Sequence, residues 1–220
     1  GHARLIGYGG EARVYAPDER RVFRLLHPGA SLSATQARAA FIEEIAVGAA
    51  HLPFATPALE RIVEIEGRIV VVERRLPGTP FSCLLAEVRG QERKDLLEAY
   101  LATAERIREI AVSRDGFGDL IAEPPVTRLS YRDYLRDRIA LTRENAGALA
   151  HLMTDTLADA MPDYTEGRLV HFDLFTGNVL MENGAVNAVI DFGATAMIAD
   201  PRLELWSAVA YLDSEISPDA

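Results

Sequence analysis

The pattern of apolar and polar positions divides the chain into a strand-rich first third and a helix-rich remainder. Period-two alternation between turn residues predicts strands, and it occurs at residues 5–16, where a glycine turn interrupts it, and at 21–26, 58–64 and 68–75. A single helical stretch, residues 34–52, lies among these strands with its apolar positions on one side. The Pro/Gly-rich step at residues 76–80 then ends the strand pattern.

After that step the apolar spacing becomes helical. It predicts helices at residues 91–110, 131–142, 146–161 and 203–212, with Ser130 as the N-cap of the second. Among the large apolar side chains of this part we expect core positions at Tyr134, Leu135, Leu149, Leu152 and Met153. Strands followed by helices indicate an α+β fold with a change of architecture near residue 76.

Composition limits the classes of function. The chain has 220 residues, 49% of them hydrophobic, which is enough for a two-lobed globule with a sizeable core. Its net charge of −10 disfavours general nucleic-acid binding and suits a cationic small molecule. No apolar run approaches the length of a membrane span and no signal peptide is evident, Gly1-His2 being read as the remnant of a processed tag. Cys83 is the single cysteine, which suits a reducing compartment, so the chain is expected to be cytoplasmic. We expect no nucleic-acid or membrane partner, and the oligomeric state is undetermined.

The most informative residues lie near the end of the chain. His171-Phe172-Asp173-Leu174-Phe175-Thr176-Gly177-Asn178 is followed, after a short polar turn, by Val189-Ile190-Asp191-Phe192-Gly193. Transfer of the γ-phosphoryl group of ATP needs a base that positions the incoming hydroxyl and oxygen ligands that hold magnesium. Asp173 suits the first task, and Asn178 and Asp191 suit the second.

The spacing of these residues predicts that they converge. Two apolar runs flank Asn183-Gly184, a dipeptide typical of a tight β-hairpin turn. In such a hairpin Asn178 enters the first strand and Asp191 leaves the second. Antiparallel pairing therefore brings the two predicted metal ligands to one edge.

These motifs resemble those of the aminoglycoside phosphotransferase family, a branch of the protein-kinase-like superfamily that phosphorylates small molecules. The pattern H-x-D-x-x-x-x-N followed by a hydrophobic-D-x-G is complete, and Phe172 stands where protein kinases carry Arg. The resemblance implies an ATP- and Mg-dependent phosphotransferase with a protein-kinase-like bilobal fold. Residues 1–76 would form the N-terminal nucleotide-binding lobe and 77–220 the mainly helical C-terminal lobe with the catalytic hairpin, joined by a hinge at about 73–78.

The same resemblance implies roles for residues along the chain. Gly9 and Gly10 would form the phosphate turn, Val22 would cover the adenine, and Arg24, in place of the usual Lys, would reach the phosphates. Glu44, preferred over Glu43, would pair with Arg24. Backbone groups of Glu73, Arg74 and Arg75 would form the hinge, Leu180 and Ile190 the floor of the site. His171 is counted with the catalytic residues as a support of the loop and of Asp191 rather than as a proton carrier.

Two questions stay open at this level. The acceptor is expected to be a hydroxylated small molecule, an aminoglycoside or other antibiotic above all, with choline, homoserine or a sugar as alternatives. Relatives continue past Asp200-Pro201 through further helices that enclose the acceptor, whereas this chain stops soon afterwards. A catalytically weak nucleotide-binding regulatory protein is the second class; Arg24 and the short C-terminus favour it, and the intact Asp173, Asn178 and Asp191 oppose it.

Overall fold

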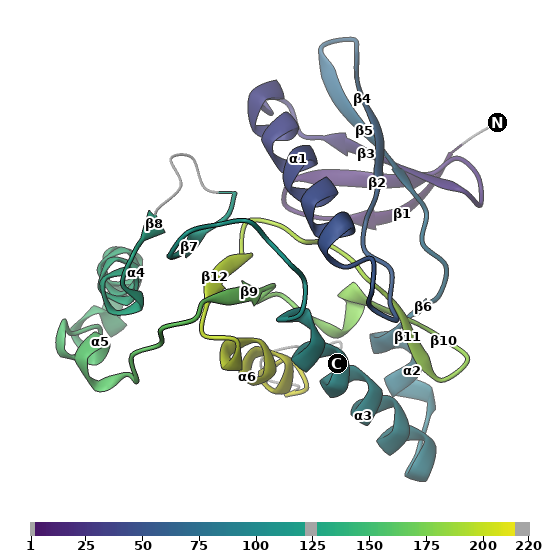
Figure 1. Cartoon of the computed structure of the whole chain (residues 1–220). Coiled ribbons are helices and arrows are strands. Elements are labelled where there is room, and N and C mark those ends of the chain that lie inside the picture. The colour runs from purple at the N-terminus through teal and green to yellow at the C-terminus, as the bar shows by residue number, and fades with distance from the viewer. Residues whose placement is uncertain (1–2, 122–126, 214–220) are drawn as a thin grey trace.

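The first part of the chain is an antiparallel sheet of five strands. The computed structural model describes residues 3–121 and 127–213 (Figure 1). The strands are ordered β1-β2-β3-β5-β4, with β1 Arg4–Tyr8, β2 Ala12–Ala16, β3 Arg21–Leu26, β4 Leu59–Ile65 and β5 Arg68–Arg74. All neighbouring strands pair antiparallel. The strands predicted for this part are therefore confirmed.

Local sequence explains the hairpin and the helix of this part. The turn between β4 and β5 has φ of 51° at Glu66 and 71° at Gly67, the left-handed pair that a two-residue hairpin requires. Helix α1 (Leu32–Gly48) starts two residues before the predicted position because the Ser31 hydroxyl accepts the N–H of Ala34 as an N-cap.

The far end of α1 is packed closely against the segment that follows helix α3 (Gly90–Ile107). A Cβ atom built on Gly48 would lie 2.2 Å from the carbonyl oxygen of Ala111, so only glycine allows this approach. Glu44, one turn earlier, accepts the N–H of Ser113 at 2.8 Å and pairs with Arg114 at 2.8 Å. The C-terminal half of α1 is thus attached to the second part of the chain.

A second sheet joins the two parts. It has the order β11-β10-β6, with β6 Thr79–Pro80, β10 Val179–Glu182 and β11 Ala185–Val189. Gly78 enters it at φ 123°, in a place where a Cβ atom would be 3.0 Å from the Leu180 Cβ. From the other side, Ala55 lies parallel to β11, donating to the Asn187 carbonyl at 2.8 Å and accepting from Val189 at 2.9 Å.

The helical part packs against the hairpin of β10 and β11. Helices α2 (Phe81–Glu87) and α3 lie beneath it, and α6 (Arg202–Ala210) packs beside α3, below β9 and β12 (Figure 1). Tyr100 of α3 is fully buried, and its hydroxyl donates to the carbonyls of Leu174 at 2.6 Å and Ala208 at 3.0 Å. This side chain ties α3 to the loop before the hairpin and to α6. Within residues 3–121 and 127–213 no helix has the length and apolar character needed to cross a membrane.

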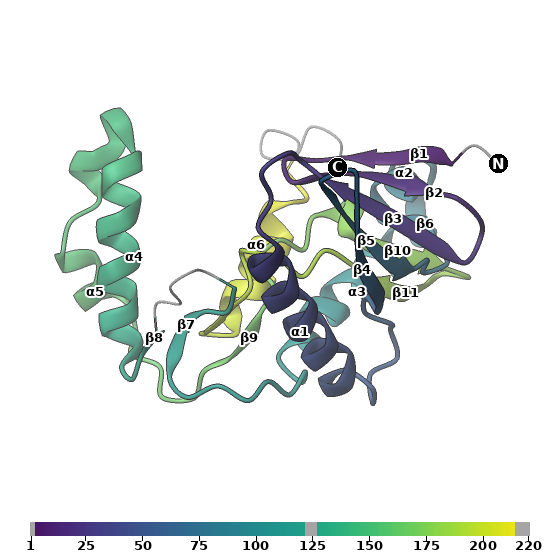
Figure 2. The ribbon, with the colours of Figure 1, turned by 90° about the horizontal axis from the view of Figure 1, so that it is seen from above.

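A third sheet of very short strands was not predicted. Its order is β8-β7-β12-β9, with β7 Phe117–Asp119, β8 Thr127–Arg128, β9 Arg168–Val170 and β12 Met197–Ala199. Strands of two or three residues are too short to show alternation in the sequence. Beside this sheet, helices α4 (Tyr131–Asn145) and α5 (Thr156–Ala160) form an arm that stands away from the rest (Figure 2).

The arm corrects two predictions. The single helix expected at 146–161 is a 3₁₀ helix, η1 (Gly147–Leu152), followed by the short α5. The Thr154 and Thr156 hydroxyls bond each other at 2.9 Å, in a segment where such side chains compete with helical backbone bonding. Leu149 and Leu152, expected in the core, are 59% and 52% exposed, whereas Tyr134 is buried as predicted.

Candidate active site

His171 begins the loop between β9 and β10 and is completely buried. Its Nδ1 accepts the N–H of Asp173 at 3.2 Å, so the ring proton is on Nε2, which donates to the Ile190 carbonyl at 3.0 Å. Burial lowers the pKa of His171, which keeps the imidazole neutral. Both ring nitrogens are engaged with backbone groups. The ring therefore supports the loop and the start of the Asp191 turn.

Glu204 of α6 is a residue of the candidate site that sequence reasoning missed. It is 1% exposed, and its Oε2 accepts the backbone N–H of both His171 and Phe172. Burial raises the pKa of Glu204 to about 7, although these backbone donors lower it. An acid between Leu203 and Leu205 in an apolar helix was the available signal, because Glu is rarely buried without a partner.

Two residues of the site have left-handed backbone conformations. Phe172 has φ 60° and Asp191 has φ 64°, values that non-glycine residues adopt infrequently. Such conformations cost on the order of 1–3 kcal/mol and cluster at functional sites. The hydrogen bonds of Glu204 and His171 on either side hold these turns in place.

The Asp173 side chain is fixed from one side. Its Oδ1 accepts the hydroxyl of Tyr211, which follows α6, at 3.0 Å. Burial first, and the Asp173 charge next, raise the pKa of Tyr211 to about 12, so the phenol stays a donor. The Tyr211 ring also meets Phe175 edge-on at 6.1 Å. Tyr211, which the sequence did not single out, thus occupies Oδ1 of the carboxylate and not Oδ2.

Asn178 is held so that one atom remains for a cation. Its Nδ2 donates to the Asp173 carbonyl at 2.9 Å, and its backbone carbonyl accepts the N–H of Ile190 at 2.9 Å. The side-chain Oδ1 is the polar atom left over. Amide and carboxylate oxygens are ligands that Mg²⁺ prefers, so Asn178 and Asp191 fit this ion. The part of the chain that the structure describes holds no cluster of three or more His, Cys, Asp or Glu suited to a metal, so phosphates and water would complete the shell.

The cations of the first lobe meet at Asp191. Its Oδ1 lies 3.3 Å from Nη2 of Arg24 and 3.0 Å from Nη2 of Arg38, a residue of α1. The predicted partner of Arg24 was wrong. Glu44 binds the segment after α3, while Arg24 lies 3.9 Å from Glu73 on the adjacent strand. Glu44 follows Arg38 by six positions, a rotation of about 240° around the helix axis, so the two side chains point to different sides of the helix.

Glu73, Arg74 and Arg75 have partners other than those expected of a hinge. Glu73 is a strand residue opposite Val22; burial raises the pKa of its carboxyl, and Arg24 lowers it. The N–H groups of Arg74 and Arg75 already donate to the carbonyls of Ala58 at 2.9 Å and Arg20 at 2.8 Å. Backbone pairing with the neighbouring strands therefore uses the amide donors that an adenine edge would need.

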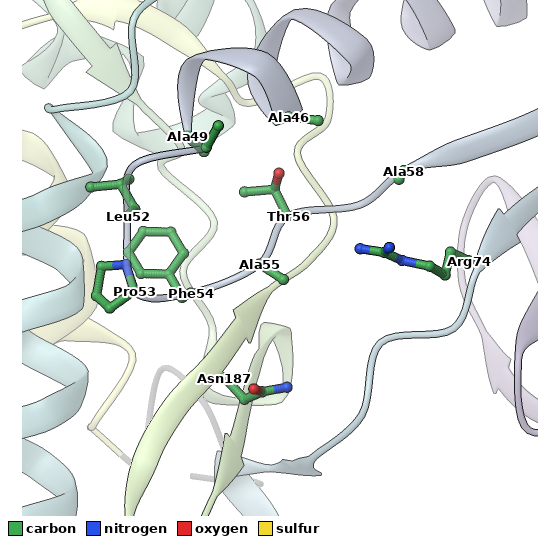
Figure 3. A pocket seen from close by; sticks show the side chains of 11 residues that line it. Ala46, Ala49, Leu52, Pro53, Phe54, Ala55, Thr56, Ala58, Arg74 and Asn187 are labelled. Atoms are coloured by element: carbon green, nitrogen blue, oxygen red, sulfur yellow. The ribbon is translucent and has the colours of Figure 1, made fainter.

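The Arg74 side chain lies beside a cavity of about 410 Å³ between the end of α1, the segment that leads to β4, and β11 (Figure 3). Small apolar residues with Phe54, Thr56 and Asn187 form most of the wall. Asp173, Asn178 and Asp191, all described residues, are not part of its lining. The cavity is thus separate from the catalytic groups.

The remaining predicted residues are distributed as follows. Gly9 and Gly10 lie in the β1–β2 turn with open space where a Cβ would be, yet neither has a positive φ, so a left-handed backbone is not their role. Val22 shares a strand face with Arg24. Leu180 of β10 is buried at 9% exposure, and Ile190, the residue after β11, is partly buried.

Comparison with known proteins identifies the family of this chain. The chain belongs to the phosphotransferase enzyme family, whose model matches residues 2–220. It is accordingly a small-molecule kinase, as the motifs indicated. No curated protein sequence matches the chain.

Solved structures show the same fold at low identity. ADP-bound aminoglycoside phosphotransferase APH(2'')-Ib matches with a TM-score of 0.62 and 13% identity over 100% of this chain and 80% of that chain. The GDP and kanamycin complex of APH(2")-IIia gives 0.59 and 20% over 99% and 80%. The streptomycin-ATP complex of APH(2")-IIa gives 0.59 and 14% over 93% and 69%. These matches confirm the predicted protein-kinase-like α+β fold.

Proposed function

We propose that this phosphotransferase moves the γ-phosphoryl group of ATP to a hydroxyl group of a small molecule, with magnesium as cofactor. The observation that carries the proposal is the hydrogen-bond network of the catalytic loop. The Asn178 side chain binds the Asp173 carbonyl, and His171 binds both the Asp173 N–H and the carbonyl before Asp191. One unit therefore holds a base and two metal ligands together.

Each residue of that unit has a distinct task. Asp173, with Oδ1 held by Tyr211, orients the acceptor hydroxyl with its other oxygen and takes up its proton. Asn178 Oδ1 and the Asp191 carboxylate would hold magnesium, which when bound neutralises charge on the phosphates. Arg24 provides a planar cation for the phosphate oxygens, and Glu73 holds that cation from the sheet side.

The nucleotide and the compartment are inferred from related facts. The similar structures are bound to ADP, GDP and ATP, so a purine nucleotide is supported; we propose ATP. The nucleotide would lie between a lobe of residues 1–76 and a lobe of residues 77–220. A cytoplasmic location would supply ATP and keep the exposed Cys83 reduced.

The acceptor is proposed to be an aminoglycoside or a similarly cationic antibiotic. Two of the similar structures contain kanamycin and streptomycin. A protein of net charge −10 attracts a polycation at long range, which favours a cationic acceptor over a neutral sugar. Choline, also cationic, and homoserine stay as alternatives. If the acceptor is an antibiotic, its phosphorylation would give resistance to that antibiotic.

A coupled ADP-release assay tests the proposal. Purified protein would be given ATP and magnesium with kanamycin, streptomycin, choline, homoserine and a neutral hexose in separate reactions. We expect acceptor-dependent ADP release that needs magnesium and is lost in Asp173→Asn. If the protein binds nucleotide but no acceptor causes ADP release, the result would instead favour a regulatory nucleotide-binding protein. Arg24 in place of the usual Lys is the residue that supports this alternative.

A further inference from the structure

Arg38 is the one basic side chain of α1, and it reaches from the helix to Asp191. Its Nη2 lies 3.0 Å from Asp191 Oδ1, and its Nη1 pairs with Glu11, which follows the glycine turn. A Cβ built on Gly193 would be 3.6 Å from Nη2, so the guanidinium lies over the Asp191-Phe192-Gly193 turn. The side chain is 25% exposed, which leaves it accessible to a ligand.

The charges around Arg38 explain why an anion is its natural ligand. Arg24 and Arg38 both share the single Asp191 Oδ1, and Glu11 and Glu73 are their other carboxylate partners. If Asp191 takes a divalent cation, two guanidinium groups are left close to that cation. Each then keeps its glutamate and loses its other carboxylate partner. The phosphate chain that arrives with the cation supplies several oxygen atoms that can replace it.

Geometry permits this exchange without large movement. Asp191 would hold the metal ion together with phosphate oxygens of the nucleotide, so those oxygens would lie beside its carboxylate. An arginine that already reaches Asp191 Oδ1 would reach such an oxygen by a change of side-chain rotamer.

We propose that Arg38 is a second phosphate-binding residue, which with Arg24 grips the phosphate chain of the nucleotide from α1. The helix thus contributes a cation to the phosphates where a carboxylate partner for Arg24 was expected. Glu11 holds the same guanidinium from the turn between β1 and β2, so Arg38 also connects that turn to the bound phosphates. The inference rests on the proposed nucleotide site but not on the identity of the acceptor.

Calorimetry with ADP and with adenosine separates phosphate contacts from base contacts. Wild type, Arg38→Gln, Arg38→Lys and Arg24→Gln would be titrated with each ligand, with magnesium and with EDTA. Arg21→Gln is the matched control. Arg21 is on β3, as Arg24 is, but it pairs with Asp18 at 2.8 Å on the surface. Thermal melting of each variant would verify folding.

We expect Arg38→Gln to weaken ADP by about tenfold or more in magnesium and by less in EDTA, where Asp191 still holds Arg38, with adenosine unchanged, because a charge-assisted hydrogen bond contributes roughly 1.5–3 kcal/mol. Arg38→Lys should recover part of the loss, and Arg21→Gln should resemble wild type. If wild type binds ADP but Arg38→Gln discriminates ADP from adenosine equally well, the Arg38 inference is wrong and the nucleotide site stands. If wild type binds no nucleotide, the proposed function fails together with it.

Discussion

The catalytic loop and the phosphate side of the site are held in different ways. In the loop, His171, Asn178 and Glu204 bind backbone groups, and two of the three are fully buried. On the phosphate side, Arg24 and Arg38 bind side-chain carboxylates at partly exposed positions. The contacts of His171 and Asn178 with Asp173 join near neighbours in the sequence, whereas the contact of Glu204 depends on the packing of α6. Contacts between charged side chains of separate elements depend on the orientation of a helix, and there the sequence prediction of Glu44 was wrong.

The largest expected effect tests the loop. Asp173→Asn keeps the shape and the bond from Tyr211 but removes the base, so turnover should fall by about 10²–10⁴-fold. ADP affinity, measured by calorimetry, should stay within error because the phosphate side is untouched. Asp163→Asn, at an exposed position of the arm, is the control. Unchanged turnover in Asp173→Asn would remove this residue from the mechanism.

The next test separates the contribution of magnesium to ADP binding from that of Arg24 and Arg38. Asp191→Asn suits the backbone, because Asn accepts the left-handed conformation seen at φ 64°. It should weaken ADP by at least about tenfold in magnesium, since a charged ligand stabilises the ion by several kcal/mol. In EDTA the affinity should be equal or tighter, because Arg24 and Arg38 are released from the carboxylate. Asn178→Ala should show a smaller magnesium effect, and equal losses with and without magnesium would contradict the metal assignment.

The buried carboxyl of the loop should give a pH-dependent stability. Its folded pKa of about 7 lies above the ordinary value of 4.5, so the folded state binds more protons between these pH values. The free energy of unfolding should therefore fall as pH rises from about 4.5 to 7, by roughly 3 kcal/mol. Glu204→Gln should flatten this dependence in urea melts at pH 5 and 8. The exposed Glu98→Gln should retain it, and identical slopes in all three proteins would refute the assignment.

A smaller effect on kcat is expected from the Tyr211 hydroxyl, a neutral group that donates a hydrogen bond to Asp173. Tyr211→Phe removes one hydrogen bond to Asp173 and keeps the ring against Phe175. A bond of roughly 0.5–1.5 kcal/mol predicts a loss of about two- to twelvefold in kcat, with the KM for ATP unchanged. Tyr164→Phe, whose ring lies near Arg202 in another region, is the control. A rise in the KM for ATP would place Tyr211 on the nucleotide side instead.

The smallest effect should come from Glu44. Its pair with Arg114 is partly exposed and should contribute no more than about 1 kcal/mol to stability. Glu44→Ala is therefore expected to lower the melting temperature slightly and to leave ADP affinity unchanged. A loss of ADP affinity comparable to that of Arg24→Gln would restore the original pairing of Glu44 with Arg24.

The difference between local and long-range contacts also explains which features could be predicted from the sequence. The Asn183-Gly184 turn and its flanking apolar runs suffice to predict the hairpin, which the structure confirms in register from Val179 opposite Val189. Glu204 could not be placed, since it lies 33 residues from His171 and reaches it only through the packing of α6. Arg38 was not recognised either, because a single Arg on a helix is ordinarily a solvated surface residue.

The attachment of α1 has a consequence for the mobility of this helix. In protein kinases, activation depends on bringing the corresponding helix into position. Here the Gly48–Ala111 contact and the Ala55 pairing with β11 fix the end of α1 within the fold itself. These contacts are internal to the chain, so we expect the C-terminal end of α1 to keep its position in the presence and in the absence of nucleotide.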